Sequence, residues 1–319
     1  MGMIVRTGNL RQREARQAVR EGTRLSRGVY FLPASPTDAP SLADRARAAL
    51  MVCPDGSAVC DITVLQLAGV DMPEGMRPPA DGPIHVLIPP DVAARSRRPD
   101  LVIHQHSHMP STFYSERLQI TAVNPEHCWA QVTARLFRGR HRPPIPQADP
   151  ADRGSFVDGS KLALLQAVQL GDALTRRHRP LVSPDRFAAQ MGLLTGMAGV
   201  QAVRETFGLI RPGTDSPNET WLRLVVIDAG FPEPTVNHKL ELGRRTRFLD
   251  LSWPDRLIAL EYQGGQHFDD PRQSRDDLQR RGQLQTAGWV MVEAVYHDLH
   301  HPGELIGRLT AAFAGRPPV

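Results

Sequence analysis

One stretch, from Phe248 to His267, constrains the fold of this chain more than any other. Its sequence, FLDLSWPDRLIALEYQGGQH, holds two short apolar runs separated by a turn over PDR. Each run carries one acidic residue, Asp250 in the first and Glu261 in the second. Because apolar runs joined by a short turn predict neighbouring strands, we expect the two carboxylates to meet in one pocket at the end of a strand pair.

Two adjacent carboxylates form an oxygen-rich site that suits a hard cation. Mg²⁺ and Mn²⁺ prefer such ligands, and these ions activate water against a phosphodiester. An acidic residue within an apolar strand also costs free energy unless it is paired or bound to a metal. We therefore expect Asp250 and Glu261 to be metal ligands. The alternative for Asp250 is an ion pair with Arg247 or Arg256.

The overall composition is that of a globular protein. Of its residues, 41% are hydrophobic and 23% are charged. The length of 319 residues is enough for two or three domains. A net charge of +4, with a pI of about 9.3, is compatible with nucleic-acid binding. Three cysteines favour reduced thiols over a disulfide framework. With no signal peptide or membrane-spanning run visible, we expect a cytoplasmic protein with no membrane partner.

The first segment, 1–35, predicts one helix followed by a tight hairpin that turns at Gly28, over residues 6–33. This arrangement resembles the second half of a winged helix. One face of the predicted helix is basic and is a candidate for contact with DNA phosphates. The alternative is a solvated basic helix. The arginines of this face are Arg11, Arg13, Arg16 and Arg20.

The second segment, 36–137, predicts a compact α/β unit. SLADRARAALMVC and ITVLQLAG are helical, and IHVLIPP, LVIHQH and LQITAV are strands. His104, His106 and His108 alternate, so they would share one face of a strand. No carboxylate or cysteine stands beside them in sequence, and we therefore favour ordinary, partly exposed histidines over metal ligands.

The third segment, 138–215, begins with a linker rich in Pro, Arg and Asp and continues as a connector of amphipathic helices. The fourth segment, 216–319, opens with a helix that has Ser216 as its N-cap, Pro217 at its first position and Gly230 after its end. Three strands, a helix, a fourth strand and a closing helix follow. The chain is thus predicted to be of the α/β (α+β) class, with the order α-β-β-β-α-β-α in its last segment.

This last segment resembles the PD-(D/E)XK nuclease superfamily, and most closely its very-short-patch-repair-like branch, over about residues 216–314. The residues that carry the resemblance are Glu219, Asp250, Glu261-Tyr262-Gln263-Gly264, Arg275-Asp276 and Gly288-Trp289. It implies an αβββαβα core and a metal-dependent DNA endonuclease or nickase. It also implies a setting in phage defence, a toxin–antitoxin system or DNA repair.

The resemblance assigns roles to further residues. Gln263 stands where the superfamily usually has Lys, and its amide can orient the attacking water but cannot carry a proton. His267 could serve as the base, since an unperturbed histidine titrates near pH 6.5, or it could be a surface loop histidine. Glu219 would either contact the metal or complete a capping box with Ser216.

The helix after the third strand is also rich in arginine. Arg275, Arg280 and Arg281 are candidates for clamping DNA phosphates. The alternative is a solvated charged face shared with Asp276 and Asp277.

Residues 6–137 resemble the AbiEi-type family of antitoxins and transcriptional regulators. The features that carry this resemblance are RQAVREGTRLSRGVYFLP, AVCDITVLQLAGV, IHVLIP, LVIHQH and LQITAVNPE. The family's winged helix begins with two further helices, so the resemblance implies a truncated domain or a start upstream. DNA, a cognate toxin or a second copy of the chain are the partners implied. A non-catalytic DNA-binding regulator is therefore the alternative function, and an interaction scaffold is a third.

Overall fold

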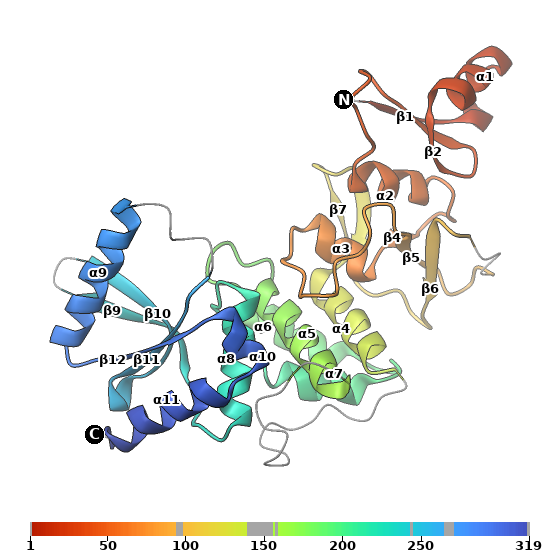
Figure 1. The fold of residues 1–319 in the computed structure, drawn as a ribbon. Coiled ribbons are helices and arrows are strands. Elements are labelled where there is room, and N and C mark those ends of the chain that lie inside the picture. Colours follow the sequence, from red (N-terminus) through yellow and green to blue (C-terminus); the bar gives the residue numbers. More distant parts are fainter. Residues whose placement is uncertain are drawn as a thin grey trace. The chain divides into compact units, whose positions relative to one another are not determined.

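The computed structural model shows a mixture of helices and β-sheets, which confirms the predicted α/β class (Figure 1). It describes residues 2–93, 98–138, 156, 159–242, 245–264 and 271–317, with only the backbone of 271–278. Most of the predicted linker lies outside the described residues. The contacts divide the chain into two compact units. Unit 1 comprises Met1–Val70, Gly75–Arg135 and Phe187–Val200, and unit 2 comprises Asp71–Glu74, Leu136–Arg186 and Gln201–Val319.

The start of unit 1 is a helix packed beside a small sheet with the strand order β1-β3-β2. The predicted helix and the hairpin after it are present, but the helix does not start at residue 6 as predicted. Met3–Arg6 pair with β3 as a strand, and Gly8 and Asn9 fall in a 3-10 turn, so the helix begins only at Gln12. It ends before Gly22, which is its C-cap. The elements are β1 (Met3–Arg6), α1 (Gln12–Glu21), β2 (Thr23–Ser26) and β3 (Val29–Leu32).

The rest of unit 1 is built on a five-stranded mixed sheet of order β6-β5-β4-β8-β7. The three predicted strands and two predicted helices are present. The strands are β4 (Ala58–Val59), β5 (Ile84–Ile88), β6 (Leu101–Gln105), β7 (Thr112–Ser115) and β8 (Ile120–Val123). The helices are α2 (Leu42–Leu50), α3 (Asp61–Leu67), α4 (Pro125–Leu136) and α6 (Pro184–Leu193), which begins at the boundary with unit 2.

Unit 2 contains a four-stranded sheet of order β12-β11-β10-β9. β9, β10 and β11 are antiparallel neighbours, whereas β12 lies parallel to β11. The observed element order agrees with the predicted α-β-β-β-α-β-α, with one additional short helix, α10. The strands are β9 (Thr235–Leu242), β10 (Arg245–Trp253), β11 (Ile258–Tyr262) and β12 (Val290–Ala294). The helices are α5 (Gly159–Leu174), α7 (Val200–Phe207), α8 (Pro217–Asp228), α9 (Pro271–Thr286), α10 (Tyr296–His300) and α11 (Gly303–Ala314).

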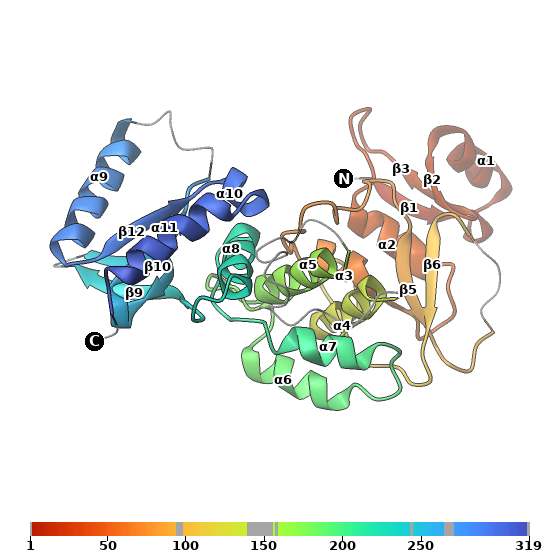
Figure 2. The ribbon, with the colours of Figure 1, turned by 60° about the horizontal axis from the view of Figure 1, so that its bottom comes forward.

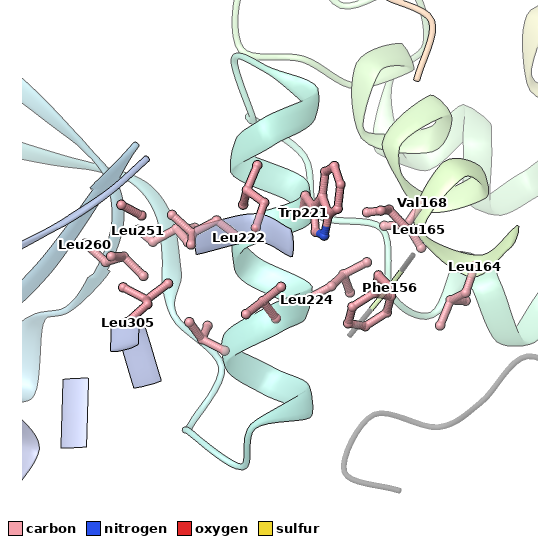
Figure 3. Packing of buried hydrophobic residues seen from close by; sticks show 14 of the residues in the cluster. Phe156, Leu164, Leu165, Val168, Trp221, Leu222, Leu224, Leu251, Leu260 and Leu305 are labelled. Atoms are coloured by element: carbon pink, nitrogen blue, oxygen red, sulfur yellow. The ribbon is translucent and has the colours of Figure 1, made fainter. Parts of the chain in front are cut away.

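Two hydrophobic clusters hold the sheet of unit 2. The larger cluster joins α5, α8 and α11 to the sheet, with Leu222 of α8 close to Leu251 and Leu260 (Figure 3). α5 packs directly against α8 (Figure 2). The smaller cluster places Leu284 of α9 against the sheet with Trp289. The parts of β10 and β11 that carry Asp250 and Glu261 are therefore fixed by apolar contacts to helices on either side.

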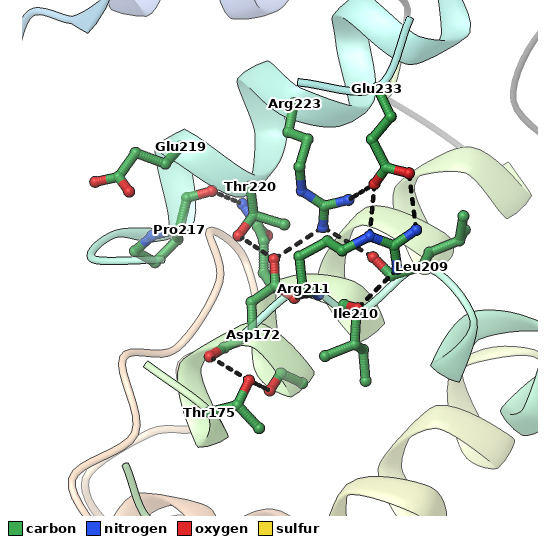
Figure 4. Close-up of polar contacts among 12 residues, drawn as sticks. Asp172, Thr175, Leu209, Ile210, Arg211, Pro217, Glu219, Thr220, Arg223 and Glu233 are labelled. Carbon is green, nitrogen blue, oxygen red and sulfur yellow. Dashed lines mark hydrogen bonds and ion pairs between the residues drawn. The ribbon is translucent and has the colours of Figure 1, made fainter. Parts of the chain in front are cut away.

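A buried ion pair also joins α5 to α8. Nη2 of Arg223 lies 2.9 Å from Oδ2 of Asp172, and both side chains are almost completely buried (Figure 4). The same oxygen accepts from the Thr220 hydroxyl at 2.8 Å, and Oδ1 accepts from the backbone N–H of Arg211 at 2.8 Å. Every oxygen of this carboxylate thus has a donor, which is the condition for burying a charge without a large penalty.

Among the described helices, none combines the length and the apolar character needed to cross a membrane.

Candidate functional site

The register of unit 2 brings Asp250 and Glu261 to neighbouring positions. Leu251 lies opposite Leu260 in the antiparallel pairing of β10 and β11. Asp250, one residue before Leu251, is therefore opposite Glu261, one residue after Leu260. The backbone N–H of Tyr262 donates to Oδ2 of Asp250 at 2.9 Å.

The two arginines considered as ion-pair partners of Asp250 lie elsewhere. Nε of Arg256 is 3.8 Å from its neighbour Asp255, and Nη1 of Arg256 donates to the Arg316 carbonyl at 2.8 Å. Nε and Nη2 of Arg247 are buried and have no hydrogen-bond partner among the described residues. The side chain of Asp250 is therefore held by a backbone N–H and not by either of these guanidinium groups.

Glu261 is buried and asymmetrically bound. Its Oε2 lies 2.5 Å from Nη2 of Arg280, which also donates to the Phe248 carbonyl at 2.8 Å. Its Oε1 has no hydrogen-bond partner among the described residues, although only 4% of the residue is exposed. A buried carboxylate oxygen without a donor is costly, and a bound cation would satisfy it.

Glu219 of α8 lies near this pair but only partly fulfils the capping role. Its backbone N–H donates to the Ser216 hydroxyl at 3.2 Å, as an N-cap requires. Its carboxylate, however, accepts from the backbone N–H of Asp215 at 2.9 Å and from Nδ2 of Asn237 at 3.1 Å. The return bond of a capping box therefore goes to Asp215 in place of Ser216.

Burial and neighbouring negative charges raise the affinity of all three carboxylates for protons. Burial, followed by the charge of Asp250, raises the pKa of Glu219 to about 7. Burial and the charge of Asp250 also raise the pKa of Glu261, even with Arg280 beside it. The pKa of Asp250 is raised mainly by burial and further by the charge of Asp215. Such shifts arise where negative charges are crowded together away from water, and they often accompany functional sites.

A fourth carboxylate and a second guanidinium lie at the edge of the group. Asp215 is paired with Arg177, whose Nε lies 3.0 Å from Oδ2 of Asp215. The Arg177 guanidinium also lies 3.9 Å above the centre of the Phe248 ring. When all of these groups are ionised, two arginines face four carboxylates among the described residues. Two negative charges are left over, and one divalent cation would neutralise them.

The donor set fits Mg²⁺ or Mn²⁺. Asp250 and Glu261 offer carboxylate oxygens, which are the ligands these ions prefer. Oε1 of Glu261, for which the described part of the chain offers no hydrogen-bond donor, is the atom best placed to become a ligand. Arg280 occupies the other oxygen and leaves this one open.

The remaining expected residues have varied surroundings. Gln263 is half-buried at the end of β11, and its backbone N–H donates to the Ala294 carbonyl at 2.7 Å. Arg281 forms an ion pair with Glu293. His267 lies outside the described residues, as does the side chain of Arg275.

In unit 1, the basic face of α1 is exposed to solvent. The exposed arginines are Arg11, Arg13, Arg16 and Arg20. Arg20 pairs with its neighbour Glu21 at 2.8 Å, and the backbone N–H of Arg11 donates to Glu14 at 3.0 Å. This face is therefore free of the burial that would prevent contact with DNA.

The alternating histidines do not lie on one strand. β6 ends at Gln105, so His106 and His108 fall beyond it. His104 meets a different set of partners: ligand atoms of Asp61, His85 and His104 all lie within 4.8 Å of one another. No carboxylate stands beside His104 in sequence, but Asp61, which is distant in sequence, is close to it in space.

Sequence reasoning also missed Asp215, Asn237 and Arg177. Asp215 directly precedes the predicted N-cap Ser216, and its position beside a helix start was a usable signal. Asn237 has a positive φ of 45° within β9, and the pattern TVNHKLEL gave no indication of this conformation. Arg177 follows α5 in a loop and reaches Asp215 only through the fold.

No family model matches the chain. The chain is similar to two uncharacterised proteins of Mycobacterium tuberculosis, from strains CDC 1551 and H37Rv, with 32% identity to each over 116 residues. The match covers 36% of this chain and 43% of each relative, so it spans less than half of the curated relatives' length.

Proposed function

We propose that unit 2 is a metal-dependent endonuclease or nickase that hydrolyses phosphodiester bonds of DNA. The observation that carries the proposal is the buried Oε1 of Glu261, which has no hydrogen-bond partner among the described residues and belongs to a crowded group of carboxylates that includes Asp250. The resemblance of residues 216–314 to very-short-patch-repair-like nucleases supports the same interpretation. The basic balance of the chain is compatible with a DNA substrate.

In this proposal, Asp250 and Glu261 hold Mg²⁺ or Mn²⁺, with Glu219 as a further acidic group nearby. The ion, when bound, polarises a phosphoryl oxygen and acidifies a water molecule. Gln263 orients the attacking water through its amide, and His267 is the candidate to accept the proton. Arg280 keeps one oxygen of Glu261 in place, and it leaves the second oxygen for the cation.

The test is nicking of supercoiled plasmid DNA by the full chain with Mg²⁺ or Mn²⁺. Asp250→Asn should reduce the rate by at least about 100-fold, because it removes a ligand charge. Asp255→Asn is the matched control, since Asp255 lies in the turn between the same two strands with 54% of its side chain exposed. Equal nicking by wild type and Asp250→Asn would overturn the proposal, as would no nicking with either ion.

A second candidate, a DNA-binding regulator of the AbiEi type, is favoured by the exposed arginine face of α1. The test is binding to duplex DNA as a function of salt. Arg13→Ala with Arg16→Ala should weaken binding and lower the slope against log salt by about one for each lost phosphate contact. Unchanged binding and slope would show that α1 does not contact DNA.

A further inference from the structure

Unit 1 holds a second cluster of possible metal ligands, separate from the carboxylates of unit 2. It consists of Asp61 at the start of α3, His85 on β5 and His104 on β6. β5 and β6 are parallel, with His85 paired to Val102 and Leu87 paired to His104. The two histidines therefore lie on the same face, one diagonal step apart, and Asp61 meets them from α3.

The distances are close to those of a ligand set. Nδ1 of His85 lies 2.9 Å from Nε2 of His104 and 3.4 Å from Oδ1 of Asp61. Two ligands at about 2.0–2.1 Å from a tetrahedral ion are separated by about 3.4 Å. The Asp61–His85 separation already has this value, and the two imidazoles need to part by only a few tenths of an ångström. In the metal-free form, their contact is an N–H···N hydrogen bond.

Asp61 is held in a conformation that the helix itself does not require. Its φ is +55°, a left-handed value that costs a non-glycine residue free energy. The backbone N–H of Asp61 donates to Oε1 of Gln131 at 3.1 Å, which anchors this conformation from α4. The carboxylate is almost fully buried, and its Oδ1 accepts from the backbone N–H of Ile62 at 2.6 Å and lies 3.4 Å from Nδ1 of His85.

One cation already competes for the site. Nη2 of Arg135 lies 2.6 Å from Oδ1 of Asp61, the same oxygen that faces His85. The Arg135 side chain is 42% exposed, so it can move into solvent when another cation arrives. Burial lowers the pKa of both His85 and His104.

We propose that Asp61, His85 and His104 bind one borderline divalent transition-metal ion of the Zn²⁺ class, with Arg135 as a displaceable competitor. Two imidazole nitrogens favour such ions over Mg²⁺, and three protein ligands leave a position for solvent or a small ligand.

The test is titration of the metal-free full chain with Co²⁺, a spectroscopic substitute for Zn²⁺, in excess Mg²⁺ to occupy oxygen-only sites. We expect one equivalent of Co²⁺ to give the visible absorption of an imidazole-ligated, low-coordinate ion. His85→Gln and His104→Gln should each weaken binding at least tenfold. His108→Gln is the matched control, because His108 is exposed and outside the cluster, and it should bind like wild type.

Arg135→Gln separates a metal site from a purely structural ion-pair network. It should tighten Co²⁺ binding several-fold, because the competing cation is removed. This readout also applies if the histidine variants fail to fold, which far-UV circular dichroism in chelator would reveal. Absence of Co²⁺ binding by wild type, binding that survives His104→Gln in folded protein, or no tightening in Arg135→Gln would overturn the proposal.

Discussion

Two buried carboxylates of unit 2, Asp172 and Glu261, each sit beside an arginine, yet their surroundings differ. Both oxygens of Asp172 accept hydrogen bonds, and its partner Arg223 is completely buried. Glu261 has one oxygen without a donor among the described residues, and its partner Arg280 is 26% exposed on its side chain. The hydrogen bonds around Asp172 compensate its burial and stabilise the fold. Oε1 of Glu261 is left available to a bound ligand.

This difference separates stability from function within one unit. Removing a fully partnered carboxylate leaves a buried arginine uncompensated, which is costly. Removing a crowded, half-satisfied carboxylate also removes repulsion from its neighbours, so the loss of stability is offset. Sites of the second kind are where proteins give up stability for activity. The comparison can be tested by four changes of decreasing expected effect.

Asp172→Ala should have the largest effect on stability. It leaves the buried Arg223 without its closest anionic partner, and we expect a loss of about 3–5 kcal/mol in the free energy of unfolding. The measurement is urea denaturation followed by tryptophan fluorescence, with the exposed-site variant Asp255→Ala as control. A loss below about 1 kcal/mol would mean that Asp172 does not contribute more to stability than Glu261 and would contradict the comparison.

The pH dependence of the metal-free protein should be the next largest effect. The folded pKa of Glu219 is raised from 4.5 to about 7, so between these values the folded state binds more protons than the unfolded state. Stability therefore falls as the pH rises from about 5 to 8, by up to about 3 kcal/mol for this group. The thermal midpoint should be compared between the wild type and Glu219→Gln across that range, because His104 and His127, whose pKa values are lowered to about 4, change stability in the opposite direction.

Glu219→Gln provides the control for this pH dependence. It should flatten the decline, because the amide does not titrate. A slope unchanged in the variant would contradict the crowding of carboxylates.

Glu261→Gln should change the free energy of unfolding by only about 1 kcal/mol in either direction. The amide keeps the shape of the side chain and removes the charge that Asp250 repels, while Arg280 keeps its bond to the Phe248 carbonyl and can donate to the amide oxygen. Metal-dependent nicking should nevertheless be lost. Measuring both stability and cleavage on this one variant tests whether Glu261 matters for activity more than for folding. A destabilisation as large as that of Asp172→Ala would contradict this difference between the two carboxylates.

Arg281→Ala should have the smallest effect, below about 0.5 kcal/mol. Its ion pair with Glu293 joins side chains that are 47% and 35% exposed, and such pairs contribute little. Arg280→Ala, one position earlier on α9, is the informative companion, since Arg280 reaches both Glu261 and the Phe248 carbonyl. Chemical denaturation of both variants should give a larger loss for Arg280→Ala; equal losses would contradict its special position.

Local signals in the sequence were sufficient for most of unit 2. Ser216, Pro217 and Gly230 mark the ends of α8, and the apolar runs around Asp250 and Glu261 form adjacent strands. The turn over PDR is short enough to fix their register. The pairing of these two carboxylates could therefore be expected from the sequence alone, because it depends on residues close together along the chain.

Contacts between segments that are distant in sequence could not be predicted from such local signals. His104 lies close to His85 because β5 and β6 are parallel neighbours, and it lies close to Asp61 because α3 begins beside these strands. Arg280 reaches Glu261 from α9, where the sequence favoured a role at the surface. Strand β1 was missed because its pairing partner, β3, follows the intervening helix α1.

Strand β1 also determines how the chain tolerates shortening or fusion at its beginning. All four of its residues pair with β3, whose sequence Val29–Leu32 is entirely apolar or aromatic. Deleting Met3–Arg6 would uncover one side of β3 as an open edge, and such an edge readily recruits a strand from another molecule. A shortened protein of this kind should aggregate, so purification tags are better attached ahead of an intact β1 than in place of it.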